Sequence, residues 1–325
     1  MYLEDKTVFL AGATGMAGSA ILKRILDHYP DTRIKALYHH TEPFITDKRI
    51  TYVHGDLRSE GDLGKMMSGC DCAIMAAAST GGVGQSGKEP WKQVNNNLIM
   101  NARMLEAFHF AGVKRVIYIG SATLYQDSDK PIKENDLDLG KDPNPSYMGV
   151  GWVSRYLEKL CKFWHDQTGM EVILVRASNI FGPYAKFDPQ NSNFIPAIVR
   201  KAVDKIDPFE VWGSPNVVRD VIYSEDFARA IVKMADNSNI KYEVFNLGSG
   251  QETSVKDIVD WALKYSGHEP SSINYDKGAP TTIKYRVLDC SKIRKMLGWQ
   301  PEYSVEEAVK QTVEWWKENK EWWKK

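Results

Sequence analysis

The segment T-V-F-L-A-G-A-T-G-M-A-G (7–18) decides the fold. Its first five residues form a β-rich run, and a helical pattern continues from its end. Gly12 permits a tight turn, Gly15 lets the backbone approach a pyrophosphate, and Gly18 permits close packing of the helix on the strand. A G-x-x-G-x-x-G pattern alone is weakly specific, but a strand before it and a helix after it are the context that the motif requires. The segment therefore predicts a dinucleotide site in which a helix N-terminus faces the phosphates.

Short β-rich runs alternate with helical patterns along the first half of the chain. The runs lie at 34–38, 51–54, 72–77, 115–120 and 171–176, and the helical patterns lie at 16–29, 91–112 and 147–168. Such alternation indicates βαβ units and a parallel sheet that is buried on both faces. We therefore predict an α/β protein with a Rossmann-type, doubly wound parallel sheet.

The pattern loosens after about residue 182. Short β-runs at 210–212, 221–223 and 244–248 are mixed there with helical patterns at 193–205, 224–236, 254–266, 291–297 and 304–320. We predict a dinucleotide-binding domain over residues 1–178 and a smaller, mixed α/β C-terminal lobe over residues 179–325. Some segments of this lobe are expected to return to the first domain.

Charge and hydropathy exclude several classes of function. The 325 residues carry 42 basic and 42 acidic side chains, so no net charge recruits nucleic acid or an anionic membrane. No run of ~18 apolar residues occurs, and the first residues lack a basic segment followed by a long apolar run. The four cysteines, which include Cys70 and Cys72, are too few and too scattered for a disulfide framework or a zinc site. We expect a cytoplasmic protein that binds no nucleic acid, membrane or metal ion.

The end of the second predicted strand bears on the choice of dinucleotide. An NAD-preferring fold usually ends this strand in an acid that accepts a hydrogen bond from the ribose 2′-hydroxyl. Here Tyr38, His39 and His40 stand where the acid would lie, and the histidines can pair with a 2′-phosphate. The sequence therefore favours NADP(H) over NAD(H). Asp56, at the end of the third strand, is placed to hydrogen-bond the adenine, and Ala76–Ala78, at the end of the fourth, to pack beside the adenosine ribose.

Several motifs occur in order along nearly the whole chain. They are the glycine loop, A-A-A at 76–78, G-S-A-T-L-Y at 120–125, and Tyr147 after a proline turn. With them the chain resembles an extended short-chain dehydrogenase/reductase, the superfamily of nucleotide-sugar epimerases, dehydratases and reductases. Within it, the chain is most similar to the GDP-L-fucose synthase-like enzymes, through G-M-A-G-S-A-I (15–21), G-G-V-G (81–84), N-I-F-G-P-Y-A-K-F-D-P-Q-N-S-N-F-I-P-A (179–197), V-W-G-S (211–214) and R-D-V-I-Y-S-E-D (219–226).

The resemblance implies that a nucleotide sugar lies between the two domains, with its hexose against the nicotinamide. The implied cofactor contacts are Gly12, Thr14, Gly15, Met16, Gly18, Tyr38, His39, His40, Asp56, Leu57, Ala76, Ala77, Ala78, Tyr147 and Asn179. The implied substrate contacts are Gly82, Val83, Asn179, Asn193, Arg200, Trp212 and Arg219. An arginine fork matches the oxygens of a diphosphate. Two of these residues also have a purely structural explanation, Trp212 as a core residue and Arg200 as a solvated helix residue.

The resemblance also implies the catalytic groups. Members of this superfamily move a hydride between the nicotinamide and a sugar carbon, usually C4. A tyrosine exchanges the hydroxyl proton, a Ser or Thr holds the same oxygen, and a lysine four residues after the tyrosine favours its phenolate. Tyr147 matches the tyrosine, and Ser121 with Thr123 match the hydroxyls, but the lysine position is Gly151. Because a tyrosine phenol ionises near pH ~10, little phenolate exists at neutral pH without a nearby cation.

Two further positions depart from the fucose synthase pattern. Those enzymes use a cysteine and a histidine for proton transfer at C3 and C5, and here the two positions are Thr123 and Asn193. Neither side chain is a general acid or base near neutral pH. Lys186 and Arg155 are candidates for the missing positive charge. The sequence therefore favours redox chemistry at C4 without 3,5-epimerisation.

Three functions fit these residues. The first is an NAD(P)-dependent oxidoreductase that acts at C4 of a nucleotide-activated hexose, with a GDP-sugar favoured. The second is a nucleotide-sugar 4-epimerase or dehydratase with a tightly bound cofactor, and the third is a non-catalytic dinucleotide- or sugar-nucleotide-binding protein. The helical patterns at 91–112 and 147–168 carry apolar stripes, and the resemblance implies that they form the four-helix interface of a homodimer.

Overall fold

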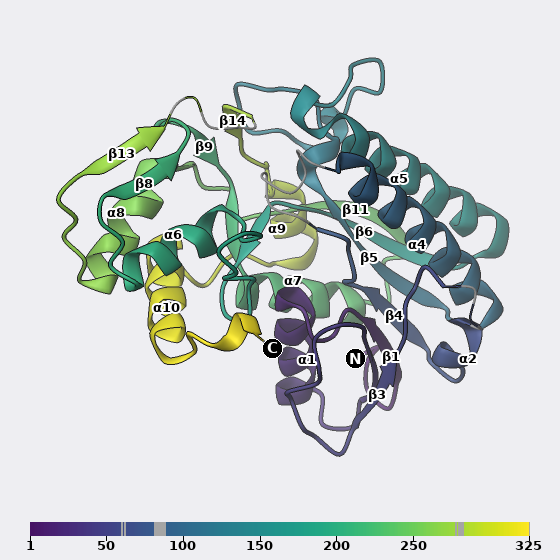
Figure 1. Ribbon diagram of the computed structural model, residues 1–325. Helices are drawn as coiled ribbons and strands as arrows, with labels where there is room; N and C mark the ends of the chain where they lie inside the picture. The colour runs from purple at the N-terminus through teal and green to yellow at the C-terminus, as the bar shows by residue number, and fades with distance from the viewer. Residues whose placement is uncertain (60, 62, 81–88, 277, 279–282, 325) are drawn as a thin grey trace.

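A computed structural model of the protein describes residues 1–59, 61, 63–80, 89–276, 278 and 283–324. Its centre is a seven-stranded sheet in the order β11-β6-β5-β4-β1-β2-β3, with every neighbouring pair parallel (Figure 1). The strands are β1 (Thr7–Ala11), β2 (Arg33–Tyr38), β3 (Ile50–His54), β4 (Cys72–Met75), β5 (Arg115–Ser121), β6 (Glu171–Ala177) and β11 (Tyr242–Leu247).

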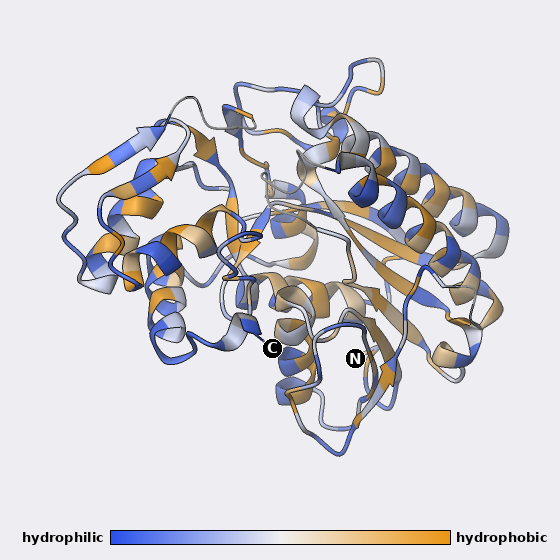
Figure 2. Ribbon diagram, in the orientation of Figure 1, coloured by the Kyte–Doolittle hydropathy of each residue, from blue (hydrophilic) through white to orange (hydrophobic). Residues whose placement is uncertain are grey.

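Helices cover both faces of this sheet (Figure 1). One face packs against α1 (Met16–His28), α7 (Ser224–Asp236) and α9 (Ser291–Leu297). The other face packs against α2 (Leu63–Met67), α4 (Pro90–Phe110) and α5 (Met148–Thr168). The strands are apolar on both sides because both faces are buried, as Figure 2 shows for β5 and β6. The predicted Rossmann-type, doubly wound sheet is confirmed.

Strand boundaries differ from the predicted ones by one or two residues. β4 ends at Met75, so Ala76–Ala78 follow the strand, and β3 ends at His54, two residues before Asp56. The β-run at 244–248 belongs to β11, which pairs with β6 at the edge of the large sheet. The first domain therefore includes one strand, β11, from the second half of the chain.

The elements that follow β6, apart from α7, β11 and α9, build a second lobe. Its helices are α6 (Phe194–Val203), α8 (Val255–Ser266) and α10 (Val305–Glu318), and their apolar faces share one core. Its strands pair as β7 (Asn179–Phe181) with β10 (Val221–Tyr223), β8 (Phe209–Trp212) with β13 (Ile273–Asp276), and β9 (Val218–Arg219) between β12 (Thr253–Ser254) and β14 (Tyr285–Arg286). Three short 3-10 helices, η1 (Ala122–Leu124), η2 (Glu134–Asp136) and η3 (Pro145–Tyr147), lie between β5 and α5 of the first domain, and η4 (Trp322–Lys324) follows α10.

The second lobe is anchored by stacked aromatic rings. The rings of Phe187 and Trp316 are nearly parallel, with centroids 4.2 Å apart, and both side chains are buried. Trp316 lies on α10, so the tryptophan-rich end of the chain packs on the lobe as an amphipathic helix. Across the described residues, no helix is both long enough and apolar enough to cross a membrane.

Candidate active site

The glycine loop between β1 and α1 has the shape of a dinucleotide cradle. Gly12 has φ of 77°, and a Cβ there would lie 2.9 Å from the backbone nitrogen of Ala77. A Cβ on Gly18 would collide with the carbonyl oxygen of Gly12. Gly15 is exposed, caps α1 without a side-chain hydrogen bond, and is followed by a first turn that holds no acid. These residues therefore fit a pyrophosphate at the N-terminus of α1.

A cluster of polar side chains lies at the ends of β2 and β3. The rings of His39 and His40 have centroids 3.7 Å apart, and His39 Nε2 lies 3.7 Å from an Asp56 carboxylate oxygen. Burial lowers the pKa of His39, and the neighbouring His40 lowers it further. Arg58 donates to both carboxylate oxygens of Asp56, at 2.9 and 2.7 Å, and these hydrogen bonds lower the pKa of Asp56. Sequence reasoning missed Arg58, although a cation two residues after Asp56 was a usable signal.

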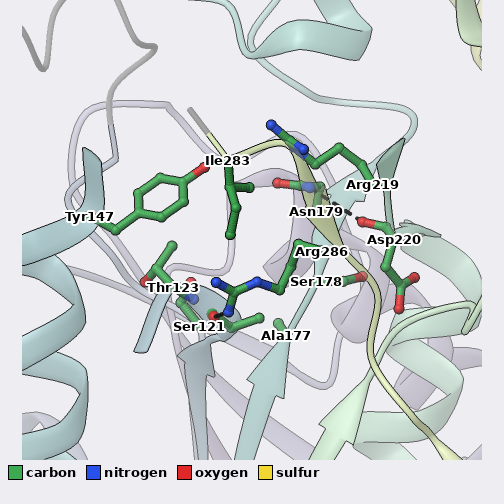
Figure 3. A pocket seen from close by; sticks show the side chains of 11 residues that line it. Ser121, Thr123, Tyr147, Ala177, Ser178, Asn179, Arg219, Asp220, Ile283 and Arg286 are labelled. Carbon is green, nitrogen blue, oxygen red and sulfur yellow. Dashed lines mark hydrogen bonds between the residues drawn. The ribbon is translucent and has the colours of Figure 1, made fainter. Parts of the chain in front are cut away.

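A pocket lies at the carboxyl ends of β5 and β6 (Figure 3). Its lining residues include five predicted site residues, which are Ser121, Thr123, Tyr147, Asn179 and Arg219. The other lining residues are Ala122, Ala177, Ser178, Asp220, Ile283 and Arg286. In open parallel sheets, ligands bind outside the carboxyl ends of the strands, so this is the expected place for a substrate. The pocket lies between the two lobes, since β9 and β14 contribute to it from the second lobe.

Tyr147 is held at the pocket by a capped turn. Asn144 accepts a hydrogen bond from the Ser146 backbone nitrogen at 2.9 Å, and its own amide donates to Asp127 at 2.9 Å. The Tyr147 backbone nitrogen donates to the Asn144 carbonyl at 2.8 Å, and α5 begins at the next residue. Tyr147 is half-buried and its ring extends into the pocket (Figure 3). This placement differs from that of a tyrosine that only packs at the start of a helix.

The hydroxyl pair comes from the end of β5. Ser121 is the last residue of the strand, and its hydroxyl oxygen accepts a hydrogen bond from the Thr123 backbone nitrogen at 3.2 Å. Thr123 lies two residues further along the chain, in η1, for which Ser121 is the N-cap. Both side chains line the pocket with Tyr147 (Figure 3), so the three hydroxyl-bearing groups of the predicted mechanism lie around one space.

The lysine position has no room for a side chain. A Cβ on Gly151 would lie 2.6 Å from Pro143 Cβ and 2.8 Å from the Thr123 carbonyl oxygen. Arg155, one of the two candidates for the missing charge, donates to the carbonyls of Leu124 and Lys141 and is buried. It therefore serves to tie α5 to the segments beside it. Lys186, the other candidate, is not among the described residues that line the pocket.

Two arginines reach the pocket from the second lobe. Arg286 is 7% exposed and donates to the carbonyls of Ala122 and Tyr125, at 2.7 and 3.2 Å. Arg219 is its register partner on the neighbouring strand. Sequence reasoning missed Arg286, and also Ser178, Asp220 and Ile283. Arg286 belongs to none of the quoted motifs, and a strand pairing across the second lobe brings it to the pocket.

Other predicted substrate residues lie elsewhere. Asn193, Arg200 and Trp212 are not among the described lining residues of the pocket. Asn193 precedes α6 as its N-cap without a side-chain hydrogen bond. Trp212 is 54% exposed, so the alternative that it is a core residue is wrong. Gly82 and Val83 lie outside the described residues.

No metal site accompanies the pocket in the described part of the chain, where His, Cys, Asp and Glu form no group of three or more that could hold an ion. Cys70 and Cys72 are buried, and burial raises their thiol pKa values to about 11 and about 12. Such thiols stay protonated near neutral pH and are poor metal ligands.

Comparison with known proteins identifies the family. The model of the NAD dependent epimerase/dehydratase family matches residues 8–248, which include the glycine loop, β5, Tyr147 and the strands that carry Asn179 and Arg219. The chain belongs to this family. The predicted resemblance to extended short-chain dehydrogenases/reductases is thereby confirmed.

The family members described next, which are similar to this chain, are named as nucleotide-sugar enzymes. A GDP-L-fucose synthase from Sinorhizobium fredii is 29% identical, over 94% of this chain and 94% of that protein. The GDP-L-fucose synthase of Escherichia coli is 26% identical over 98% of each chain. A crystal structure of the dTDP-glucose 4,6-dehydratase from Streptomyces venezuelae with NAD bound has a TM-score of 0.83 at 24% identity, and the match covers 98% of each chain. The present chain therefore has the fold of an epimerase/dehydratase over almost its full length.

Proposed function

We propose that the protein is an NAD(P)-dependent oxidoreductase that acts at C4 of a nucleotide-activated hexose, with a GDP-sugar as the favoured substrate. The observation that carries this proposal is the placement of Tyr147, Ser121 and Asn179 around one pocket at the carboxyl edge of the sheet. The GDP-sugar preference is supported by the similarity to GDP-L-fucose synthases over nearly the whole chain.

The residues of the pocket support a division of roles. A bound nicotinamide dinucleotide supplies the acceptor or donor of the hydride. The Ser121 hydroxyl is placed to hydrogen-bond the C4 oxygen, and the Tyr147 hydroxyl is placed to exchange a proton with it. Asn179 lies on β7 beside this pair and offers an amide to a neighbouring sugar hydroxyl. In the reductive direction the neutral phenol of Tyr147 donates the proton, so no base is needed at that step.

The same pocket argues against epimerisation at C3 and C5. Its described lining residues include no cysteine and no histidine. The two positions at which a fucose synthase carries these groups are Thr123 and Asn193, and Asn193 is exposed at the start of α6. A carbon acid next to a keto group needs a positioned base, and neither side chain is one near neutral pH. The residues present fit redox chemistry at C4.

NADP(H) is our proposed dinucleotide. The end of β2 carries Tyr38, His39 and His40 without an acid, and Arg58 lies beside them through its ion pair with Asp56. A 2′-phosphate placed there meets three basic or ionisable groups, His39, His40 and Arg58, against the one carboxylate of Asp56, whereas a 2′-hydroxyl lacks its usual carboxylate partner from β2.

The test measures turnover and product together. Hexoses and 4-keto-hexoses linked to GDP, UDP, CDP and dTDP are incubated with each oxidised or reduced dinucleotide, and nicotinamide absorbance and sugar products are followed. We expect one sugar nucleotide to give net hydride transfer, and Tyr147→Phe to lower that rate at least about 100-fold. Tyr156→Phe, an exposed tyrosine on the same helix, is the matched control and keeps the wild-type rate.

Three outcomes contradict the proposal. Conversion at C4 without a net change in nicotinamide absorbance indicates a 4-epimerase or dehydratase with a retained cofactor. Tight binding of sugar nucleotide and dinucleotide without any turnover indicates a binding protein. Unchanged turnover in Tyr147→Phe shows that another group transfers the proton.

A further inference from the structure

Three aromatic rings meet where the two lobes touch, and we call them the aromatic clasp. Phe44 lies in the loop 39–49 between β2 and β3, Tyr184 in the turn after β7, and Trp322 in η4. The centroid of the Phe44 ring is 4.8 Å from that of Tyr184 and 4.5 Å from that of Trp322. The rings of Tyr184 and Trp322 are 5.0 Å apart. Each ring thus contacts the other two at distances that favour aromatic pairs, and the first domain and the second lobe both contribute.

The clasp also reaches α1, the helix that begins at the glycine loop. Lys23 of α1 donates a hydrogen bond to the Tyr184 hydroxyl at 3.2 Å and lies over the same ring, 5.2 Å from its centroid. Met16, the first residue of α1, packs against the second-lobe core that also contacts Trp322. In Figure 1 the yellow end of the chain around η4 accordingly lies beside α1. The clasp therefore rests on the helix whose N-terminus fits the dinucleotide phosphates.

Phe44 holds the middle of a loop that starts at the proposed 2′-phosphate site. The loop begins with His39 and His40. Its far end is tied down because Arg49 donates to backbone carbonyls at the end of α1, at 3.0 and 3.1 Å. Among the described residues, the stretch 41–44 makes no hydrogen bond. The position of this stretch therefore depends on the ring contacts of Phe44 with the second lobe.

Tyr184 connects the clasp with the pocket. It lies in the turn after β7, the strand that carries the pocket residue Asn179. Its φ of 63° is a left-handed backbone conformation that is costly for a bulky residue, so the contacts around it have to hold it there. The clasp rings are half-buried, whereas Phe187 and Trp316 stack fully buried in the lobe core. That core pair would remain in place if the clasp opened.

We propose that the aromatic clasp holds the two lobes closed around a bound dinucleotide, and that Trp322 sets how fast the dinucleotide leaves. Phe44 links the clasp to the loop at the adenosine end, and Tyr184 links it to the turn after the pocket strand. A dinucleotide on the glycine loop lies between these two segments, so it leaves only when the rings separate. The three residues are positioning residues, because they act through the loop and the turn. The inference rests on the dinucleotide site of the proposed function and not on the chemistry at C4.

The clasp has a kinetic consequence for the proposed oxidoreductase. An enzyme with net hydride transfer has to release its dinucleotide in every turnover, whereas a 4-epimerase keeps it bound. Opening of a closed site and release of product limit kcat in many enzymes. A weaker clasp should therefore raise KM for the dinucleotide and keep kcat at or above the wild-type value. A change that only damages the structure would lower kcat.

The direct test needs no sugar nucleotide. Bound NADPH or NADH is chased from the full-length protein with an excess of its oxidised form, and the loss of reduced nicotinamide fluorescence is followed by stopped flow. We expect the dissociation rate of both dinucleotides to rise about 5-fold in Trp322→Ala, which loses one ring contact between the loop and the second lobe, and about 20-fold in Phe44→Ala, which loses two. The double variant should match Phe44→Ala, because that change alone already removes both contacts.

Two further variants serve as controls. Trp322→Phe keeps an aromatic ring in the clasp and should stay within about 2-fold of the wild-type dissociation rate. Ile206→Ala removes an exposed apolar side chain from the same lobe and should leave the rate unchanged. If Trp322→Ala does not fold, as judged by circular dichroism, Phe44→Ala carries the test because Phe44 is a half-buried loop residue.

Unchanged dissociation rates in both Phe44→Ala and Trp322→Ala overturn the proposal. A double variant whose rate is the product of the two single effects also overturns it, since the residues then act separately. With an active sugar nucleotide, a lower kcat at an unchanged dissociation rate assigns the rings a structural role alone. A wild type that binds neither dinucleotide contradicts the proposed function together with this inference. Dinucleotide binding without turnover of any sugar nucleotide contradicts the proposed function alone, and the dissociation rates still decide the role of the clasp.

Discussion

Gly151 and Pro143 compete for one space: a Cβ on Gly151 would lie 2.6 Å from the Cβ and 2.7 Å from the Cγ of Pro143. The Thr123 carbonyl oxygen closes the same space at 2.8 Å. Real Cβ atoms essentially never come this close to another heavy atom, so the loop before Tyr147 has to move if position 151 carries a side chain. The packing of α5 against the turn that positions Tyr147 therefore requires a glycine at position 151, where the family pattern has a lysine.

This packing predicts that Gly151→Lys does not increase activity. Gly151→Ala should lower the free energy of unfolding by about 1–2 kcal/mol, because overpacking costs about 1–3 kcal/mol and the gain in helix propensity returns at most about 1 kcal/mol. Gly151→Lys should be less stable still and displace Tyr147. Urea unfolding measures the first effect and turnover the second. Lys159→Ala, at an exposed position of the same helix, is the control and should change stability little. A gain in turnover in Gly151→Lys would contradict this explanation.

The sequence predicts the large sheet well because its central strands, such as β1, β4 and β6, are short apolar runs buried on both faces. The helix at 291–297 and the helix at 224–236 have the predicted bounds. The sequence does not predict that β11 joins the large sheet, because a β-rich run alone does not show which strand it pairs with. Its pairing with β6 depends on packing between distant segments.

The pocket residues also divide into those that the sequence predicts and those that depend on contacts between distant segments. Tyr147, Ser121 and Asn179 follow strands or turns whose ends the sequence indicates, and all three line the pocket. Arg286 reaches it only because β14 pairs with β9, and β14 is two residues long. The sequence shows that position 151 is glycine, but the Pro143 contact that requires glycine is visible only in three dimensions.

The cluster at the end of β2 predicts a pH-dependent preference for NADPH. Because burial and the charge of His40 lower the pKa of His39, that imidazole becomes charged only below the usual histidine range near pH ~6.5. The ratio of NADPH to NADH affinity should therefore rise only as the pH falls below the usual histidine range. Arg58→Ala should weaken NADPH binding about 10-fold and leave NADH binding nearly unchanged, since only the former carries a 2′-phosphate. Fluorescence titration of each dinucleotide measures both effects, and equal losses for the two would contradict the assignment.

Asp220 predicts a pH dependence of stability. Burial raises its pKa to about 6, against the pull of hydrogen bonds from Leu288 and Ser249, whereas an unfolded aspartate titrates near ~3.9. Since the folded-state value is higher, the carboxyl contributes stability below about pH 4, and this contribution is lost as the pH rises through about 6. The difference in unfolding free energy between wild type and Asp220→Asn should change by roughly 3 kcal/mol across this window, in favour of the wild type at low pH. Urea unfolding at several pH values measures this difference in unfolding free energy, and Asp166→Asn is the exposed control. Parallel plots of unfolding free energy against pH for wild type and Asp220→Asn would show that the Asp220 carboxyl does not titrate in this pH window.

The exposed faces of α4 and α5 predict a homodimer. Large apolar side chains stay exposed along both helices, at Trp91, Ile99, Phe110, Met148, Trp152, Tyr156 and Phe163. Positions 148, 152, 156 and 163 of α5 follow helical spacing, so they form one stripe on one side of the helix. A contiguous apolar surface of this kind marks an interface more often than a free surface. Two copies packed through these helices would bury the stripe in a four-helix arrangement.

Charge placed in the stripe should separate the two copies. Sedimentation at micromolar concentration is expected to give a dimer for the wild type and a monomer for Phe163→Glu, because burying an unpaired carboxylate costs several kcal/mol. Ile206→Glu changes an exposed apolar residue of the second lobe in the same way and should leave the dimer intact. A monomeric wild type would contradict the interface, and a dimer that persists in both Phe163→Glu and Tyr156→Glu would place the contact on another face.

Dimerisation should also affect turnover, because Met148 and Trp152 follow Tyr147 within the first turns of α5. Burial of these two side chains in the interface should slow the opening of the turn that holds Tyr147. Dilution below the dissociation constant of the dimer should therefore lower the turnover per chain.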